Sequence, residues 1–489
     1  METYAYYADG RWLEPAGGEY FDSENPYTGK AWAKIPRCNA ADANIAVQAA
    51  YRAYHEGPWG RMNPGERGEM VRRLGDAVAS HADRLAEIEV RDNGKRRVDI
   101  HPGLSSWLID SFYYYAGMAD KLEGAVIPTG RDQILNYTRH EPYGVVAAIT
   151  AWNSPLLIAI WKLAPALAAG NTVVLKPSEF ASASTLELMK AFEDADLPSG
   201  VINTVTGFGA EVGEPLVTHE KVRKVSFTGS VEGGARVAGL AAKTIKNVTM
   251  ELGGKSPQLV FDDARLEDTV HGVCGGIFPP AGQSCIAGSR LLLQSGIYDD
   301  FVEKLLEVTA RARLGDPNDA ATSIGPIANK THFERVLGHI ERARQSAATL
   351  ACGGNAVNPD GAGGWFIEPT VFTDVTPDMP LAREEIFGPV LAVMRFDSEE
   401  EAVQIANDSD FGLAAGIWTE DHRRALDLAN RLEAGTVYLN NYFDACTQSP
   451  VGGYKQSGYG RENGWEGMRD FLQTKSVWLS TARRIDAPF

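Results

Sequence analysis

Between residues 143 and 252 the chain alternates short apolar runs with segments of helical pattern. The strand-like runs are 145–150, 172–175, 201–206, 224–227 and 248–252. The helical segments between them are 156–168, 181–194, 210–217 and 230–243. Strands that alternate with helices form right-handed crossovers, and therefore a parallel sheet with helices on both faces. Ligands of such sheets bind beyond the carboxyl ends of the strands, so we expect a site in the loops that follow these runs.

A second α/β series is expected between about 265 and 440. Its clearest helices are 298–313, 332–348 and 400–408, and its strand-like runs are 290–294, 389–396 and 436–440. The 489 residues predict two to four domains at ~100–200 residues each. Because neither a repeat nor a low-complexity linker separates the two series, we expect them to pack together with a cleft between.

The remaining segments have other patterns. Residues 11–36 are rich in Pro and Gly, which predicts turns between short strands. Residues 40–118 have a helical pattern, whereas 124–142 is expected to be extended, with a hairpin as an open alternative. The segment 471–480 is expected to form a terminal strand.

Charge and composition exclude several classes of partner. The 47 Lys and Arg against 64 Asp and Glu give a net charge of −17, with no basic cluster, which argues against nucleic acid or an anionic membrane. Five cysteines without a Cys-x-x-Cys pair indicate a reducing compartment. The start of the chain lacks a signal-peptide pattern, and the apolar stretch 154–170 is interrupted by Lys162 and Pro165. We therefore expect a soluble cytoplasmic protein without a metal site.

Cys285 ends the sequence Gly-Gln-Ser-Cys at 282–285, which predicts a turn after an apolar helix. A thiolate is the strongest side-chain nucleophile near neutral pH once a helix end or a charge lowers its pKa. A free cysteine is more often buried and inert, and Cys274, on the apolar face of a helix predicted at 266–277, fits that description. The turn before Cys285 does not suit a core element, so Cys285 is the candidate nucleophile.

Two further side chains stand where strand-like runs end. Glu251 precedes two glycines, and a carboxyl group in such an apolar setting would have a raised pKa and could act as a general base. A solvated edge residue or a structural ion pair is the alternative for Glu251. Asn153 ends Thr-Ala-Trp-Asn at 150–153, and its amide could donate a hydrogen bond to an oxyanion. A simple turn before Pro155 is the alternative for Asn153.

Three loops have polar residues suited to a nucleotide. Lys176 and Glu179 could bond ribose hydroxyls, or form a solvated pair. Ser230 follows Phe-Thr-Gly at 227–229 and opens a helix, which would present backbone N–H groups to a phosphate or place Ser230 as an N-cap. The glycines at 207, 209 and 213 are spaced one residue longer than the usual dinucleotide fingerprint. All these residues follow strand ends of one α/β unit, which favours a ligand-binding site there.

These motifs resemble those of the NAD(P)-dependent aldehyde dehydrogenases over nearly the whole chain. The resemblance includes Asn-Pro-x-Thr-Gly at 25–29, Glu-Ile-Phe-Gly-Pro at 385–389 and the segment 449–464, which contains Ser-Pro-Val-Gly-Gly-Tyr-Lys-Gln-Ser-Gly. The motifs occur in the family's order with similar separations. The resemblance implies the family's α/β fold, with a Rossmann-type cofactor domain, an α/β catalytic domain and a small β oligomerisation segment.

The resemblance also implies a mechanism. Cys285 would attack the aldehyde carbon to give a thiohemiacetal, whose oxyanion Asn153 and the Cys285 backbone N–H would hold. Loss of hydride to the nicotinamide would leave a thioester. Glu251 would activate the water that hydrolyses it to a carboxylic acid.

The implied cofactor is NAD. Family likeness assigns Lys176 and Glu179 to the adenosine ribose and Ser230 to the pyrophosphate. A carboxylate at 179 can accept hydrogen bonds from free ribose hydroxyls but would repel a 2′-phosphate, which favours NAD over NADP. The other residues expected around the cofactor are Ala151, Trp152, Gly209, Gly213, Phe227, Gly229, Leu252, Glu385 and Phe387.

The chain departs from the family where the aldehyde would bind. Ser154, Ala445 and Val451 stand where the family commonly has aromatic residues, which suggests a wide tunnel and a bulky, aromatic or ring-derived aldehyde. Trp161 and Phe278 are further candidates for the tunnel wall, with core packing equally open for both.

The resemblance predicts a division of the chain into units. The cofactor domain would comprise 1–123 and 143–253, the catalytic domain 254–465, and the oligomerisation segments 124–142 and 466–489, in a homodimer or homotetramer. A CoA-acylating semialdehyde dehydrogenase is the alternative enzyme, but such members usually lack the Glu at 251. A non-catalytic structural protein is the alternative class, and it would be expected to have lost Cys285, Asn153 or Glu251.

Overall fold

The computed structural model describes residues 1–482, so the part of the predicted oligomerisation segment at 483–489 lies outside the described residues. Its first large sheet has eight strands in the order β24-β12-β11-β8-β9-β10-β2-β3. The five central strands are parallel, which confirms the alternation predicted for 143–252. They are β8 (Val145–Ile149), β9 (Thr172–Lys176), β10 (Ile202–Thr204), β11 (Val222–Thr228) and β12 (Asn247–Glu251).

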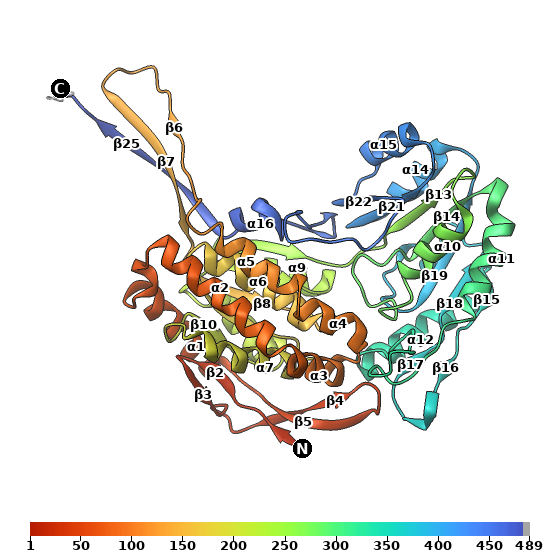
Figure 1. Cartoon of the computed structure of the whole chain (residues 1–489), viewed down its shortest axis with the longest axis horizontal. Helices are drawn as coiled ribbons and strands as arrows, with labels where there is room; N and C mark the ends of the chain where they lie inside the picture. Colours follow the sequence, from red (N-terminus) through yellow and green to blue (C-terminus); the bar gives the residue numbers. More distant parts are fainter. Residues whose placement is uncertain (483–489) are drawn as a thin grey trace.

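Strand β8 is buried on both faces of this sheet. Val146 and Ala148 pack in one hydrophobic cluster, and Val145 and Ala147 pack in a second one. The first cluster includes residues of α2 (Pro64–Ser80), α5 (Trp107–Ala116), α6 (Pro155–Ala168) and α7 (Ala183–Phe192), and the second includes residues of α1 (Ala40–His55) and α9 (Val231–Ala242). Since alternate residues of a strand point to opposite faces, helices cover both sides of the sheet (Figure 1).

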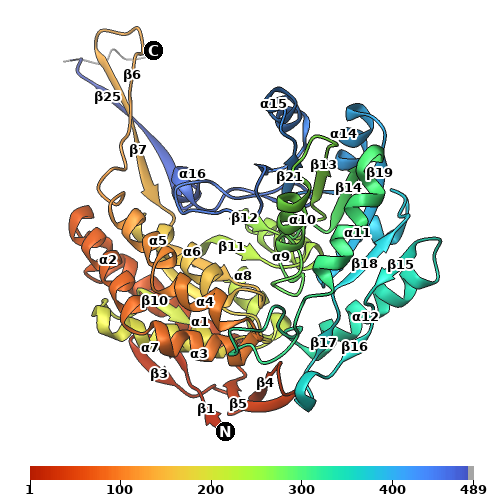
Figure 2. The same cartoon turned by 45° about the vertical axis from the view of Figure 1, so that its right-hand side comes forward.

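The second large sheet has seven strands in the order β15-β18-β19-β14-β13-β21-β22. Strands β14 (Arg290–Gln294), β19 (Val390–Phe396) and β22 (Thr436–Leu439) were expected. Strands β13 (Pro257–Val260) and β21 (Ala414–Trp418) were not, because they contain Pro, Gly and Ala, which are weak strand formers. Helices α10 (Leu266–Gly275), α11 (Tyr298–Thr309), α12 (Lys330–Arg344) and α14 (Glu399–Asn407) flank this sheet (Figure 2).

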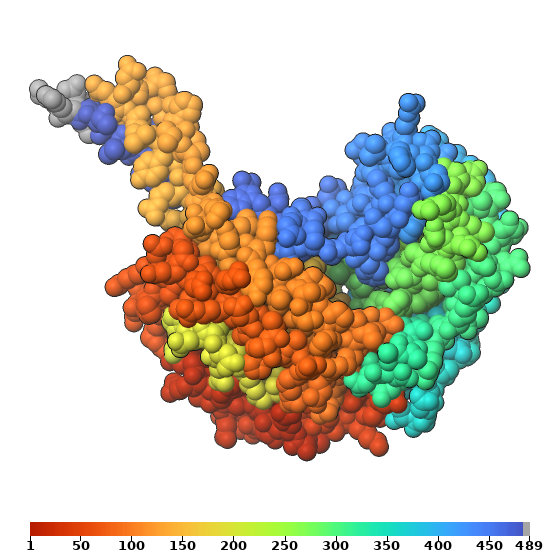
Figure 3. Space-filling view, in the orientation of Figure 1, coloured from red at the N-terminus to blue at the C-terminus, as the bar shows by residue number. Residues whose placement is uncertain are grey.

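A long three-stranded arm projects from the body (Figure 1). Strand β7 (Ile134–Pro142) pairs antiparallel with β25 (Leu472–Ser480) along its full length, and β6 (Val126–Ile127) pairs with its other edge. This confirms the extended structure expected for 124–142 and the terminal strand expected for 471–480. The space-filling view shows a concave surface between the arm and the lobe that contains α14 (Figure 3).

We propose that the two large sheets are the cofactor and catalytic domains expected from the sequence. One strand crosses the proposed boundary, because β24 (Gly458–Tyr459) pairs antiparallel with β12. An N-terminal hairpin of β4 (Tyr20–Asn25) and β5 (Lys30–Pro36) forms a separate small sheet with β1 (Glu2–Thr3). Among residues 1–482, no helix is both long and apolar enough to cross a bilayer.

Candidate active site

A cavity of about 1390 Å³ lies at the carboxyl ends of β8, β9, β11 and β12. Strand order reverses around β8, since β9 lies on one side of it and β11 on the other, and such a reversal is where ligands bind in doubly wound sheets. Loops of the second sheet close the opposite wall. The predicted residues that line this cavity are Ala151, Trp152, Asn153, Ser154, Trp161, Lys176, Glu179, Gly209, Gly213, Phe227, Gly229, Ser230, Glu251, Leu252, Cys285, Glu385, Phe387, Ala445 and Val451.

The prediction that Phe278 lines the tunnel is wrong. Phe278 is buried in the hydrophobic core of the second sheet, and it is absent from the cavity lining formed by residues 1–482. The segment after α10 continues the helical turn, since Phe278 N donates to Cys274 O. The Phe278 ring packs in the hydrophobic core.

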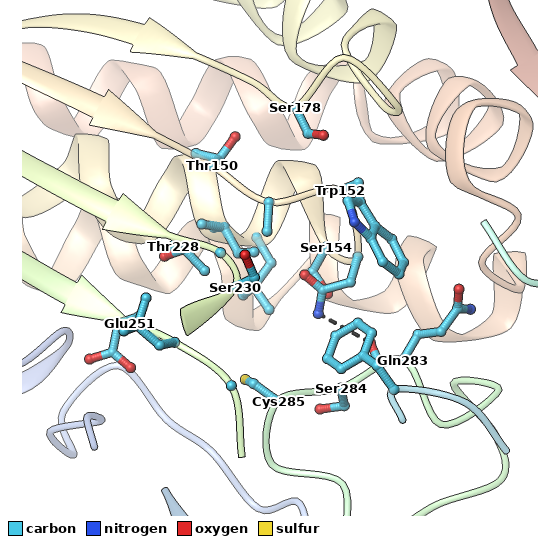
Figure 4. A pocket seen from close by; sticks show the side chains of 18 of the residues that line it. Thr150, Trp152, Ser154, Ser178, Thr228, Ser230, Glu251, Gln283, Ser284 and Cys285 are labelled. Atoms are coloured by element: carbon cyan, nitrogen blue, oxygen red, sulfur yellow. Dashed lines mark hydrogen bonds between the residues drawn. The ribbon is translucent and has the colours of Figure 1, made fainter. Parts of the chain in front are cut away.

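The loop that carries Cys285 depends on a glycine. Gly282 has φ +69°, and a Cβ at this position would lie 1.8 Å from the carbonyl oxygen of Gly388. A side chain would therefore be both strained and obstructed at residue 282. The loop then places Cys285 in the cavity opposite the β12 end that carries Glu251 (Figure 4).

The Cys285 thiol is protonated in this environment. Burial, together with the negative charges of Glu251 and Glu385, raises its pKa to about 12, although the backbone N–H groups of Ile286 and Cys285 favour the thiolate. A nucleophilic role therefore requires a base that takes the thiol proton as the carbon–sulfur bond forms.

Glu251 is a buried carboxyl group whose Oε1 has no hydrogen-bond partner among the described residues. Burial and the nearby Glu462 raise its pKa well above the usual range, and Lys162 opposes that shift. Lys162 lies in α6, donates to Glu462 Oε1 at 2.5 Å and also bonds Ser226 Oγ at 3.0 Å. A raised pKa suits a group that must accept and release protons near neutral pH.

Asn153 lies two residues before the start of α6, and its side chain is anchored. Asn153 Nδ2 donates to the carbonyl oxygen of Gln283 at 3.1 Å, which ties the β8 loop to the Cys285 loop (Figure 4). Asn93 Nδ2 lies 3.4 Å from the carbonyl oxygens of both Trp152 and Asn153. The amide is thereby held beside the nucleophile.

The other half of the cavity has features that suit a nucleotide. Lys176 Nζ lies 3.8 Å from Glu179 Oε2 and donates to Pro177 O, beside the end of β9. Ser230 caps α9 by accepting from Gly233 N at 3.1 Å, so the N-cap alternative is correct, and the amino end of the helix still lines the cavity. Glu385 accepts from Gly254 N at 2.9 Å.

Several residues of the cavity were missed. His332 packs against Trp152 and Phe387, with ring centroids 5.0 and 5.8 Å away, and its Nε2 lies 2.7 Å from Phe387 O. Burial lowers the pKa of His332 to about 4. No local pattern in the sequence indicated His332. Outside the cavity lining, a single cation within an apolar stretch, Lys162, could have indicated the buried ion pair with Glu462.

Known proteins match this chain over nearly its full length. Residues 12–477 match the model of the aldehyde dehydrogenase family. The betaine aldehyde dehydrogenase of Mesorhizobium japonicum is 43% identical over 480 residues, which cover 98% of this chain and 98% of that protein.

Solved structures match it as well. The structure of a betaine aldehyde dehydrogenase from Staphylococcus aureus in complex with NAD⁺ has a TM-score of 0.97 at 38% identity, covering 99% of this chain and 96% of that one. The NAD⁺ complex of an aldehyde dehydrogenase from Bacillus cereus has a TM-score of 0.96 at 41% identity, covering 98% and 97%.

Proposed function

Because this chain belongs to the aldehyde dehydrogenase family, we propose that it oxidises its aldehyde through a thioester on Cys285, which water activated by Glu251 hydrolyses to a carboxylic acid. The resemblance stated from the motifs, the fold class and the enzyme class are confirmed by the family match and the full-length relatives. The individual steps and the substrate are our proposal.

The observation that carries this mechanism is that Cys285, Asn153 and Glu251 line a single cavity although they come from two loops and the end of strand β12. Cys285 Sγ bonds to the aldehyde carbon while its proton passes to a base. The negative charge then gathers on the former carbonyl oxygen, which Asn153 Nδ2 and the Cys285 backbone N–H stabilise. Asn153 must turn partly from the Gln283 carbonyl to do so, since it donates there at 3.1 Å.

The cofactor is NAD, which accepts the hydride that leaves the thiohemiacetal carbon; relatives with 38% and 41% identity are solved in complex with NAD⁺. Residues of this chain fit such a group. Glu179 and Lys176 stand at the end of β9, where a ribose would lie, and the amino end of α9 faces the cavity to receive a pyrophosphate. Glu179 would repel a 2′-phosphate, so turnover with NAD should exceed turnover with NADP.

The aldehyde is proposed to be bulky, aromatic or ring-derived. Ser154, Ala445 and Val451 line the cavity in place of larger side chains, and Trp107 and Trp161 give it aromatic walls. A panel of aliphatic and aromatic aldehydes tests this proposal by NAD reduction. If short aliphatic aldehydes have the higher kcat/KM throughout, the substrate proposal is wrong.

The mechanism itself is tested with Cys285→Ala. We expect this variant to bind NAD with unchanged Kd but to lose aldehyde oxidation, since no other described cysteine except the exposed Cys446 lines the cavity. Full activity of Cys285→Ala would contradict the mechanism. Product analysis with and without CoA separates hydrolysis from the acylating alternative, and a free acid formed without CoA supports the role of Glu251.

A further inference from the structure

One cation of the cavity has no role in the mechanism above. Lys95 follows α3 (Ala82–Asn93) and lines the cavity together with Cys285 and Ser154. Its Nζ donates to Ser154 Oγ at 2.5 Å. Among residues 1–482, Lys95 forms no ion pair within 4 Å, and the acid that acts on it most strongly is the buried Glu89 of α3.

The backbone around Lys95 is held in place. Gly94 has φ +77°, and a Cβ there would lie 2.6 Å from Pro326 Cγ, so only glycine fits this turn. Asn93 Oδ1 accepts from Lys95 N at 3.0 Å, and the same side chain reaches the carbonyl oxygens of Trp152 and Asn153. The turn is therefore attached to the segment that supplies the oxyanion donor, which fixes Lys95 relative to the reacting carbon.

Among the described residues, no acid that lines the cavity forms an ion pair with Lys95. Glu89 lies in α3 and acts on Lys95, but it is buried in the protein and does not line the cavity. Asp99 lines the cavity and is bonded by Arg96 at 2.6 and 2.8 Å. Asp444, on the loop after β22, lines the cavity and is exposed. Burial lowers the pKa of Lys95, as expected for a cation that lacks a close counter-charge.

The identity of residue 154 makes this contact possible. A family-like aromatic ring at this position would occupy the space through which Lys95 reaches the hydroxyl. Ser154 is buried and accepts from Lys95, so its own O–H remains able to donate to a second acceptor. An ammonium and a hydroxyl side by side are suited to a carboxylate, which accepts from both.

We infer that Lys95 and Ser154 form a subsite for a carboxylate carried by the aldehyde substrate. This inference rests on the proposed function and deepens it: the substrate class is an aldehyde acid, of a size that fits the cavity widened by Ala445 and Val451. The same ammonium repels a substrate that carries a quaternary ammonium group.

The test compares matched ring aldehydes that differ only in charge. Formylbenzoic acids, their methyl esters and formyl-trimethylanilinium ions, each in the meta and para forms, are assayed for kcat/KM by NAD reduction. A charged hydrogen bond within a partly desolvated site predicts that the acid is preferred over the ester by about 10- to 100-fold in at least one of the two forms, and that the cation is the poorest substrate.

The variants locate this preference in Lys95. We expect Lys95→Met to lower kcat/KM for the acid by about 10- to 100-fold while changing the ester by less than about threefold. Lys95→Arg should retain the preference for the acid. Ser154→Ala should weaken it in the same direction, and Lys304→Met, outside the cavity, should leave every ratio unchanged.

The outcomes are separable. An equal loss for acid and ester in Lys95→Met means that Lys95 acts on Cys285 or on the fold, and the inference is wrong. Wild-type oxidation of the esters without preference for the acids also contradicts the inference while leaving the proposed function intact. Failure to oxidise any of these aldehydes, or a broad aliphatic panel, overturns both. Thermal unfolding and NAD binding of each variant show whether the protein remains folded.

Discussion

At the scale of single residues, the surroundings of the proposed nucleophile and of the proposed base both disfavour the charged form. Burial and two carboxylates raise the pKa of Cys285 to about 12, and burial with Glu462 raises that of Glu251. Each group therefore avoids an isolated charge in a poorly solvated cavity. In the proposed mechanism, the Cys285 thiol loses its proton as its sulfur bonds to the aldehyde carbon. We therefore expect Cys285 to react mainly when the aldehyde is bound.

The pH dependence of Cys285 reactivity should reveal its coupling to Glu251. Once Glu251 is ionised, its charge disfavours the thiolate, so Glu251→Gln should lower the Cys285 pKa. We expect faster iodoacetamide alkylation of Cys285 in the variant, with a difference that grows as rising pH ionises Glu251 in the wild type. Mass spectrometry of the Cys285 peptide measures this. Glu251→Asp is the control, and equal rates in wild type and Glu251→Gln at every pH would show that the two groups are not coupled.

Glu251→Gln should also separate the two halves of the reaction. In the proposed mechanism, formation of the thioester needs Cys285 and Asn153, whereas its hydrolysis needs a water activated by Glu251. We expect one burst of NADH per active site, followed by a steady-state rate lowered by about 100-fold or more, because general base catalysis contributes about 10²–10⁴-fold. Stopped-flow absorbance measures the burst, and intact mass measures the acyl adduct. A slow variant without a burst would assign Glu251 to an earlier step.

At the scale of elements, α6 joins the active site to the core. Its first turn follows Asn153, and its interior carries Lys162, fully buried against Glu462 from a segment 300 residues away. A buried pair of this kind gives little net stability, but loss of one partner leaves an uncompensated charge. The helix therefore depends on a contact that its own sequence does not contain.

Lys162→Met should destabilise the protein by about 3–5 kcal/mol, because Glu462 is then buried without its cation. Denaturant unfolding measures the free energy. The double variant Lys162→Met with Glu462→Gln should regain a large part of the loss, since it removes both charges. If the double variant is as unstable as the sum of the single ones, the pair is not coupled.

At the scale of the whole molecule, much of β6 and β25 in the arm of β6, β7 and β25 is exposed. Val126, Trp478 and Leu479 are exposed on it, and β6 presents an open strand edge. Exposed apolar residues along an unpaired edge favour association with a second copy. We propose that this arm joins subunits in a homodimer or homotetramer.

Trp478→Glu combined with Leu479→Glu should lower the mass in solution while leaving the cavity intact. Light scattering after size-exclusion chromatography measures the mass. Ile245→Glu, at an exposed position on the body, is the matched control and should not change it. An unchanged mass in the arm variant would place the interface elsewhere.

The sequence by itself determined the alternation of 143–252 and the family, and it supplied the proposed set of Cys285, Asn153 and Glu251, because strand and helix periods and loop motifs are local properties of the chain. Sequence reasoning missed strands with weak local signals, such as β21. It also misplaced the Phe278 side chain, whose position depends on packing in the core.

Only the tertiary structure decided which charges lie together. Lys95 meets Ser154 across 59 residues and Lys162 meets Glu462 across 300. The pKa values of Cys285 and Glu251 follow from burial and from such distant neighbours, and neither desolvation nor long-range distance is encoded in the residues on either side.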